Sequence, residues 1–311
     1  MRIVFMGTPS FAIPSLDAII DSDHEIAMVV TKTDRPKGRG KVLTPPPVKV
    51  RAEEMGLKIY QPFKVGESSF IDKLRELKIE MIVVTAFGQI LPLEILNIPE
   101  YGCLNLHASL LPRYRGAAPI NWAIIRGEKM TGVTTMLMDK GMDTGHIYLQ
   151  REIEIGDKER AGGLTERLGG IGAKLLIETI DGIKNGRLSP NPQEGEVIYA
   201  PIIKKSDARI DWSCRAGDIY NLVRGMDPWP VAYTFYKDER WLVWDVSVKA
   251  GSSGNIIGEY GEIEDVTKEG ISVRTGDGLV LIKELQPINR RRMKSREYIA
   301  GHRIEKGVVL C

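Results

Sequence analysis

The sequence lacks the long apolar runs that membrane proteins carry. Its longest runs, such as IVVTAF at 82–87, have the length of a strand, whereas a membrane-spanning helix needs roughly 20 apolar residues. Met1 leads directly into another strand-like run, so we also expect no targeting segment. These absences predict a protein without a membrane partner.

The sequence also has few cysteines and a small net charge. The three cysteines, Cys103, Cys214 and Cys311, show neither CxxC nor Cys/His spacing, so we expect no disulfide framework and no metal site. A reducing cytoplasm is the location that fits such cysteine usage. The 43 Lys and Arg residues nearly balance 41 Asp and Glu residues, leaving a net charge of +2. Overall composition therefore does not indicate a nucleic-acid partner, and only local clusters of charge can do so.

The first half of the chain alternates apolar, strand-like runs with amphipathic, helix-like segments. The runs RIVFM, EIAMVVT, LKIYQP, EMIVVTA and CLNLHA begin at residues 2, 25, 57, 80 and 103, and two further strands are expected at 133–139 and 146–155. Strands buried on both faces with helices between them predict an α/β fold with a doubly wound, mostly parallel, Rossmann-like sheet. A long helix is expected over about 164–184.

A change of pattern near residue 187 indicates a second domain. The polar, proline-rich segment RLSPNPQEGE at 187–196 is typical of a linker, and beyond residue 209 short alternating strands are separated by glycine-rich turns. We predict a catalytic domain over 1–186, a linker over 187–208 and a small C-terminal β-barrel, similar to an OB-fold, over 209–311.

The first strand ends in a glycine turn before a helix, FMGTPSFAIPSL, which is a common place for an anion. It lacks GxGxxG, and TKTDRPKGRGK replaces the acidic residue expected after the second strand of a dinucleotide-binding fold. Dinucleotide binding is therefore disfavoured. A helix start capped by Thr8 or Ser10 explains the turn equally well.

Three polar residues form the strongest candidate site. Asn105 and His107 lie two apart on one strand and so share a face at its carboxyl end, while Asp143 lies in a glycine-rich loop that can fold back to them. Each alone is commonly structural. Together they supply a neutral hydrogen-bond donor, a proton-carrying imidazole and a carboxylate to orient it. No activated Ser or Cys accompanies them, so we expect direct attack by a nucleophile of the substrate, with the enzyme stabilising an oxyanion.

Several motifs carry a resemblance to a known family. NLHASLLPRYRGAAPINWAI at 105–124 and MDKGMDTG at 138–145 resemble the signature of formyltransferases that use 10-formyltetrahydrofolate. Further similar motifs are MGTPSFA, DRPKGRGKVLTPPPVK, KKSDARIDW and DPWPVAY, so the resemblance spans the whole chain. Within the family it is to the branch whose acceptor is initiator methionyl-tRNA.

The resemblance implies a reaction and a set of residues. The formyl group would pass from N10 of the folate to the α-amino group of the methionine, with Asn105, His107 and Asp143 as catalytic residues and no metal. Folate contacts are implied for two segments and one loop residue: Phe87, Gly88, Gln89, Ile90, Leu91, Ser109, Leu110, Leu111, Pro112 and Asp139. We expect a monomer.

Two local basic clusters favour the tRNA acceptor. Residues 32–51 carry a net charge of +6 and residues 286–306 a net charge of +5. Either cluster alone is more often a solvated face, but two on one chain are typical of nucleic-acid binding. The residues implied in tRNA binding are Arg35, Lys37, Arg39, Lys41, Lys204, Lys205, Arg290, Arg291 and Arg292. The glycines on both sides of Arg39 predict a mobile loop.

Two alternatives stay open at this point. The first is a formyltetrahydrofolate enzyme acting on a small amine, such as glycinamide ribonucleotide or an amino sugar nucleotide, which would need neither basic cluster. The second is a non-catalytic tRNA-binding protein, which would not need Asn105, His107 and Asp143 to converge.

Overall fold

The computed structural model describes residues 1–37, 40, 42–249 and 258–311. It forms two compact units. The first consists of Met1–Pro119, Met130–Glu154 and Thr165–Ala200, and the second of Ile120–Lys129, Ile155–Leu164 and Pro201–Cys311. The boundaries expected from the sequence, at 186 and 208, stay a prediction.

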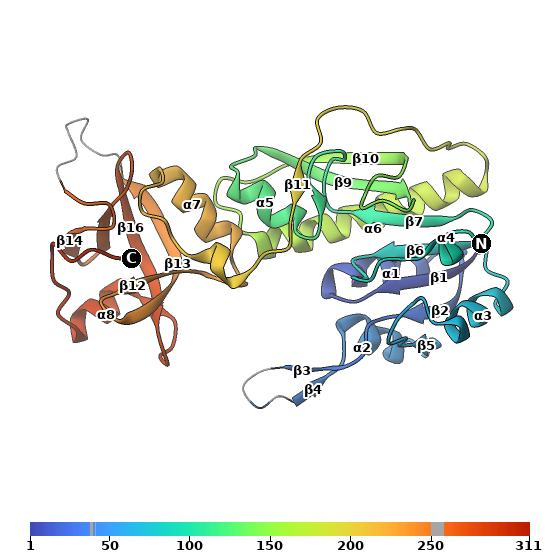
Figure 1. The fold of residues 1–311 in the computed structure, drawn as a ribbon, viewed down its shortest axis with the longest axis horizontal. Coiled ribbons are helices and arrows are strands. Elements are labelled where there is room, and N and C mark those ends of the chain that lie inside the picture. The colour runs from blue at the N-terminus through green and yellow to red at the C-terminus, as the bar shows by residue number, and fades with distance from the viewer. Residues whose placement is uncertain (38–39, 41, 250–257) are drawn as a thin grey trace. The chain divides into compact units, whose positions relative to one another are not determined.

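A seven-stranded sheet organises the described part of the first unit (Figure 1). Its order is β10-β9-β7-β6-β1-β2-β5. The five strands from β7 to β5 in this order are parallel, whereas β9 pairs antiparallel with both β7 and β10. The strands are β1 (Arg2–Gly7), β2 (Glu25–Val30), β5 (Ile59–Tyr60), β6 (Met81–Thr85), β7 (Cys103–His107), β9 (Met130–Leu137) and β10 (Ile147–Glu154). The expected doubly wound, mostly parallel sheet is confirmed.

Helices cover both faces of this sheet because its strands are apolar on both sides. In β1, Val4 and Met6 pack with helices α3 and α4, whereas Ile3 and Phe5 pack with α1, α2 and α6. This alternation follows from the period of two along a strand. The helices are α1 (Ile13–Ile20), α2 (Pro47–Glu54), α3 (Ser68–Glu76), α4 (Leu93–Leu96) and α6 (Ala161–Lys184).

Several short elements lie outside the main sheet. In the basic segment after β2, strands β3 (Arg35–Lys37) and β4 (Val42–Thr44) pair as a hairpin that sequence analysis did not predict. Strand β8 (Arg115–Gly116) pairs with β11 (Tyr199–Ala200), which ties the expected linker to the turn after β7. The remaining short elements are α5 (Pro119–Ile125) and two 3-10 helices, η1 (Ser10–Ala12) and η2 (Lys205–Ala208).

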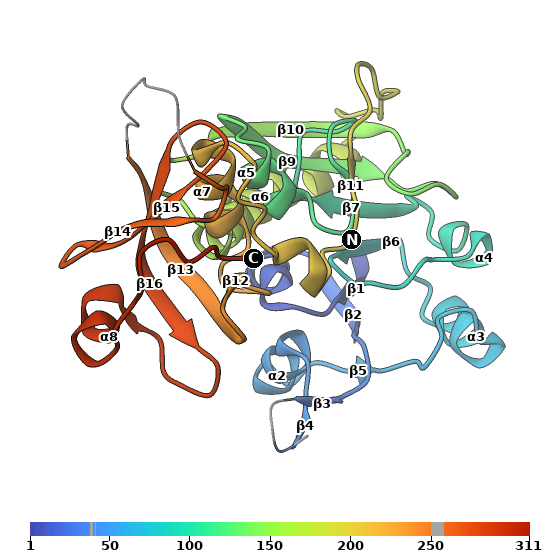
Figure 2. The same ribbon diagram turned by 60° about the vertical axis from the view of Figure 1, so that its left-hand side comes forward.

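The second unit is built on antiparallel strands (Figure 2). Their order is β12-β13-β16-β15-β14, with β17 on β16. The chain end closes the gap between the outer strands: Ile263 N donates to the Val308 carbonyl at 2.9 Å, and Phe235 N to the Cys311 carbonyl at 2.8 Å. The elements are α7 (Ala216–Gly225), β12 (Ala232–Tyr236), β13 (Glu239–Lys249), β14 (Ile263–Thr267), β15 (Gly270–Arg274), β16 (Leu279–Pro287), β17 (Met293–Lys294) and α8 (Ser295–Gly301). The expected small β-barrel is confirmed.

Candidate active site

Strand β7 carries Asn105 and His107 to the carboxyl edge of the parallel strands. Both are buried, with exposed fractions of 9% and 6%. The His107 Nε2 atom lies 3.0 Å from the Tyr114 carbonyl oxygen. Because a carbonyl only accepts, Nε2 carries a proton and the ring orientation is fixed.

The other ring nitrogen of His107 faces Asp143. The Nδ1 atom lies 3.7 Å from Asp143 Oδ1, which is longer than a hydrogen bond. The Nδ1 atom therefore faces the carboxylate without a direct hydrogen bond to it.

Asp143 is held by backbone and side-chain contacts that sequence analysis missed. Its backbone is left-handed, with φ 53°, and its Oδ2 atom accepts a hydrogen bond from Gly116 N at 2.8 Å. The Gln193 amide donates to the carbonyls of Asp143 and Gly145 at 2.8 and 2.7 Å, while Arg115 donates to the Gln193 Oε1 atom. A residue of the expected linker thus positions the loop that carries the carboxylate.

Asn105 differs from its neighbours because its amide makes no hydrogen bond to any residue that the structure describes. The side chain is nevertheless buried. Its amide atoms are not fully buried, so water can reach them.

The turn after β7 is held by two polar residues of neighbouring strands. Thr134 Oγ1 donates to the Ser109 carbonyl at 2.6 Å, and Leu111 N donates to Thr134 Oγ1 at 3.2 Å. The Gln150 amide donates to the Leu111 carbonyl at 2.9 Å. Ser109, Leu111 and Pro112 are buried, whereas Leu110 is half-buried. No signal in the sequence distinguished Thr134 or Gln150 from other strand residues.

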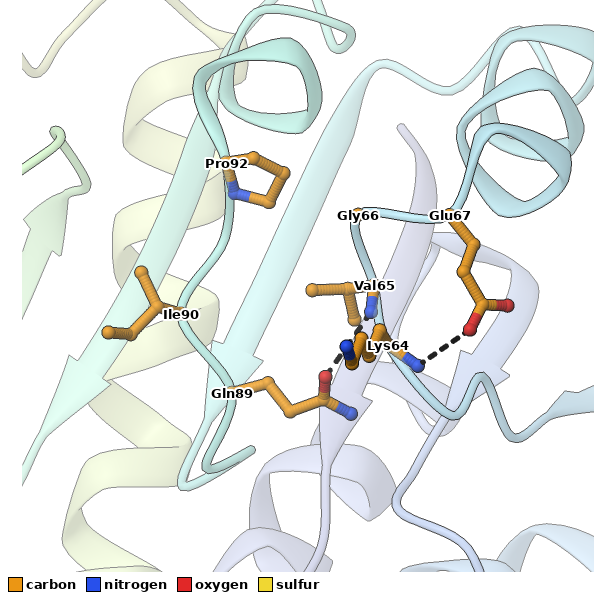
Figure 3. Close-up of a pocket in the computed structure, with 7 residues that line it drawn as sticks. All are labelled: Lys64, Val65, Gly66, Glu67, Gln89, Ile90 and Pro92. Atoms are coloured by element: carbon orange, nitrogen blue, oxygen red, sulfur yellow. Dashed lines mark hydrogen bonds between the residues drawn. The ribbon is translucent and has the colours of Figure 1, made fainter.

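Residues 87–91 form a loop beside a pocket of about 400 Å³. Figure 3 shows the pocket lined by Gln89, Ile90 and Pro92 on one side and by residues 64–67 on the other. Gln89 Oε1 accepts a hydrogen bond from Val65 N at 3.2 Å, which joins the two walls. Phe87 and Leu91 are buried, whereas Ile90 is 81% exposed and free to contact a ligand.

Gly88 is required at its position. Its φ is +79°, and a Cβ atom there would lie 2.6 Å from Lys32 Nζ. Burial lowers the pKa of Lys32, and the charge of Arg35 lowers it further. The end of β2 and the loop after β6 therefore pack closely together at the carboxyl edge of the sheet.

Asp139 is placed apart from the other residues implied in folate contacts. It lines a separate pocket of about 930 Å³, together with Tyr101, Gly102 and Met138 among others, whereas Gln89 and Ile90 line the smaller one. Its Oδ1 atom accepts hydrogen bonds from Gly141 N and Thr144 Oγ1 at 2.9 and 2.6 Å. The observed contacts of Asp139 fix the turn that leads to Asp143.

The basic residues divide by their surroundings. Arg35, Lys204, Lys205, Arg290 and Arg291 are exposed. The Arg292 guanidinium forms an ion pair with Glu284 and lies over the Trp244 ring at 4.6 Å. Lys37 contributes its backbone to the β3–β4 hairpin. Arg39 and Lys41 lie outside the described residues.

The described ranges hold neither a cluster of metal ligands nor a disulfide. No group of three or more His, Cys, Asp or Glu gathers there as a metal site would require, and Cys103, Cys214 and Cys311 are free thiols. Burial raises the pKa of Cys103 to about 12, so its thiol stays protonated. No described helix is long and apolar enough to cross a membrane.

Comparison with known proteins agrees with this architecture. The Formyl transferase family matches residues 1–180, and the Formyl transferase, C-terminal domain family matches residues 202–303. A formyltransferase structure from Helicobacter canadensis, in complex with folinic acid and dTDP-3-aminofucose, superposes with a TM-score of 0.68 at 19% identity and covers 94% of this chain and 100% of that one. A structure of methionyl-tRNA formyltransferase from Clostridium thermocellum superposes with a TM-score of 0.56 at 21% identity, covering 81% and 95%. These structures share the fold.

Sequence relatives are much closer. Methionyl-tRNA formyltransferase from Acetivibrio thermocellus is 50% identical over 311 residues, covering 100% of this chain and 99% of the relative. The protein of that name from Clostridioides difficile is 51% identical over 311 residues, with both chains fully covered. The resemblance noted in the sequence is confirmed, and the chain belongs to the methionyl-tRNA formyltransferase family.

Proposed function

We propose that the chain transfers a formyl group from 10-formyltetrahydrofolate to the α-amino group of initiator methionyl-tRNA. The observation that carries the proposal is the convergence of Asn105, His107 and Asp143 at the carboxyl end of β7, in a chain of this family. We further propose that the enzyme is cytoplasmic, because its acceptor is aminoacylated tRNA, and that it is monomeric.

The amine needs little activation. An α-amino group has a pKa of about 7.7 to 8.0, so on the order of a tenth of it is neutral at pH 7. A bond forms between this nitrogen and the formyl carbon, the bond from that carbon to N10 breaks, and the amine's proton ends on N10. The protein therefore has two tasks, which are to stabilise charge on the formyl oxygen and to move one proton.

Asn105 and His107 perform the first task. The free Asn105 amide donates to the formyl oxygen as that oxygen gains charge, and the Nδ1 proton of His107 donates to the same atom. Asp143 performs the second task by orienting the imidazole and a water that relays the proton. Gly116 and Gln193 hold the Asp143 loop in place while this happens.

The folate-binding proposal rests on two segments. Residues 87–91 present a buried Phe87, an exposed Ile90 and a pocket for a flat ring, and residues 109–112 form a fixed turn after β7. The mixed apolar and amide lining of the pocket, from Val65, Ile90 and Gln89, suits a heteroaromatic ring. Asp139, which lies at a separate pocket, would act through the turn that it fixes before Asp143.

The tRNA-binding proposal rests on the basic residues. Arg35, Lys37, Arg39 and Lys41 belong to the basic segment after β2, and Lys204 and Lys205 lie at η2. Arg290 and Arg291 stand exposed near β17, whereas the charge of Arg292 is partly neutralised by Glu284. Arg291 lies 3.9 Å from Glu297, which is a looser ion pair than that of Arg292. Cations that are weakly paired or unpaired are those that release counterions on binding phosphate.

One assay with the purified full chain tests the proposal. Formyl transfer from 10-formyltetrahydrofolate is measured with initiator methionyl-tRNA, free methionine and glycinamide ribonucleotide as acceptors. We expect turnover with methionyl-tRNA only. Turnover with the small amine would favour the small-amine enzyme, and tRNA binding without turnover would favour a non-catalytic role.

A further inference from the structure

Strand β12 of the second unit carries two aromatic rings on one face of the sheet. Along β12 buried residues alternate with half-buried ones, and the half-buried positions are Tyr233 and Phe235. In the register with β13, Tyr233 pairs with Leu242 and Phe235 with Arg240, so these side chains share one face of the sheet. The two rings meet edge to face, with centroids 5.9 Å apart.

Arginines lie over both rings. The Arg209 guanidinium carbon is 6.0 Å from the Phe235 ring centroid, and that of Arg240 is 5.5 Å from the Tyr233 ring centroid. Both arginines are exposed. We call Arg209, Tyr233, Phe235 and Arg240 the aromatic face.

The charges of the aromatic face are not neutralised. Within the described part of the chain, neither Arg209 nor Arg240 has a carboxylate within 4 Å, the limit of an ion pair. Two other cations over rings in this unit differ, because Lys237 over Tyr236 pairs with Glu305, and Arg292 over Trp244 pairs with Glu284. A third, the buried Arg224 over Tyr220, donates to the carbonyls of Gly156 and Glu159. A cation in this unit can therefore lie over a ring and be paired with a carboxylate at the same time. The two free guanidinium groups are left available to an anionic ligand.

The combination of flat rings, flat guanidinium planes and unpaired positive charge fits one chemical class. Nucleobases stack on aromatic side chains and on guanidinium planes, and the phosphates that link them pair with arginine. Only unpaired nucleotides expose their base faces in this way, since duplex bases are covered by their neighbours. An acidic protein would satisfy the arginines but would gain nothing from the rings.

We propose that the aromatic face binds unpaired nucleotides of the tRNA acceptor, with bases on the rings or guanidinium planes and phosphates on Arg209 and Arg240. The inference rests on the proposed function for the identity of the RNA. The contacts implied at Arg290 and Arg291 are ionic, whereas part of the affinity of the aromatic face for RNA would come from stacking. Stacking and charge respond differently to salt, and this difference makes the proposal testable.

Two double variants separate the contributions. Tyr233→Leu/Phe235→Leu removes the rings and keeps apolar bulk, whereas Arg209→Gln/Arg240→Gln removes the charges. The affinity of each full-length variant for initiator tRNA is measured between about 50 and 200 mM salt. We expect the ring variant to raise Kd at least about fivefold, the lower end of a stacking contribution, with the salt slope unchanged. The arginine variant should lower the slope by up to about 0.9 for each phosphate that it no longer binds.

The matched control is Lys237→Gln/Glu305→Gln, which removes a neutral cation–carboxylate pair over a ring of the same unit. It should leave both affinity and salt slope unchanged. Folate affinity should be the same in all variants. If the ring and arginine variants bind tRNA as the parent does, the proposal is overturned, whatever protein or other ligand the face contacts.

Crosslinking in the unaltered protein guards against variants that fail to fold. Initiator tRNA containing 4-thiouridine is irradiated with the parent enzyme, and crosslinked peptides are mapped by mass spectrometry. We expect adducts at Tyr233 or Phe235, and adducts confined to other segments would overturn the proposal. Formylation by the same parent preparation tests the proposed function separately: an active parent without these adducts refutes the aromatic face alone.

Discussion

The side-chain amide of Gln193 holds the Asp143 loop by donating to the Asp143 carbonyl at 2.8 Å. It donates also to Gly145, and Arg115 donates to its oxygen, so one amide joins three segments of the first unit. Gln193 touches no reacting atom and acts as a positioning residue for the carboxylate.

We expect Gln193→Ala to lower kcat about tenfold while KM for both substrates changes little, because a displaced Asp143 loses orientation and not substrate contacts. Gln193→Asn, with a shorter reach, should recover only part of the rate. The matched control is Asn191→Ala, whose side-chain amide donates, among the described residues, only to the nearby Ser189 carbonyl. Equal kcat in Gln193→Ala and in the parent would show that the loop holds without it.

Asn105→Ala tests the free amide at the end of β7. Losing one donor to a developing oxyanion typically costs about 2.7 to 4 kcal/mol, so kcat should fall by roughly two to three orders of magnitude. The affinity for folate, measured by equilibrium titration, should stay close to that of the parent. A variant with near-native kcat would remove Asn105 from the mechanism.

His24 makes stability depend on pH. Its side chain is buried, and burial lowers its pKa below the usual 6.5. The unfolded chain therefore binds the proton more readily, so stability is fully present above about pH 6.5 and is lost as pH falls toward the folded pKa. The slope is at most about 1.4 kcal/mol per pH unit.

Thermal midpoints between about pH 5.5 and 7.5 measure this effect. His24→Gln should flatten the acid side of the profile, whereas His146→Gln, at an exposed position, should leave it unchanged. An identical profile in His24→Gln and the parent would assign the acid sensitivity to other groups.

The exposed pair Arg290 and Arg291 should contribute to tRNA affinity through charge. We expect Arg290→Gln/Arg291→Gln to weaken binding and to lower the salt slope by up to about 0.9 for each phosphate that is no longer neutralised. Arg292→Gln should have a smaller effect on the slope, because Arg292 pairs closely with Glu284 whereas Arg291 lies 3.9 Å from Glu297. Parallel salt titrations of all three proteins would show an unaltered slope if this patch is only a solvated face.

The sequence of the basic segment after β2 supports a prediction for Arg39. Arg39→Ala should lower kcat/KM for methionyl-tRNA at least about tenfold, roughly 1.4 kcal/mol, with folate affinity unaffected. Arg39→Lys should restore only part of the activity, because an ammonium cannot form a forked contact. Undiminished kcat/KM in Arg39→Ala would exclude this residue from recognition.

The main sheet was predictable because its strands are strongly apolar, and burial on both faces leaves few alternatives for such runs. The ends of individual strands and helices were less predictable. The expected strand at 57–62 is reduced to Ile59–Tyr60, and α6 begins at Ala161 instead of about 164 because Gly162 and Gly163 show no apolar pattern. The β3–β4 hairpin was missed because glycines and prolines are also typical of loops.

The site was predictable where its residues lie on one strand. Asn105 and His107 follow from the period of two along β7, and the DKGMD spacing indicated a loop long enough to return. Gln193, Thr134 and Gln150 could not be found in this way, because their roles depend on contacts between segments remote in the sequence.

The second unit consists of three separate segments of the chain, so one contiguous stretch of the gene does not encode all of it. Its buried Arg224 donates from Nη1 to the carbonyls of Gly156 and Glu159, and the Gly225 carbonyl accepts from the Asn121 amide. Those partners come from Ile155–Leu164 and Ile120–Lys129, which precede residue 201 in the chain. Recombination at residue 201 would separate a buried guanidinium from its acceptors. The buried hydrogen bonds of the second unit therefore require segments of the chain that lie on both sides of residue 201.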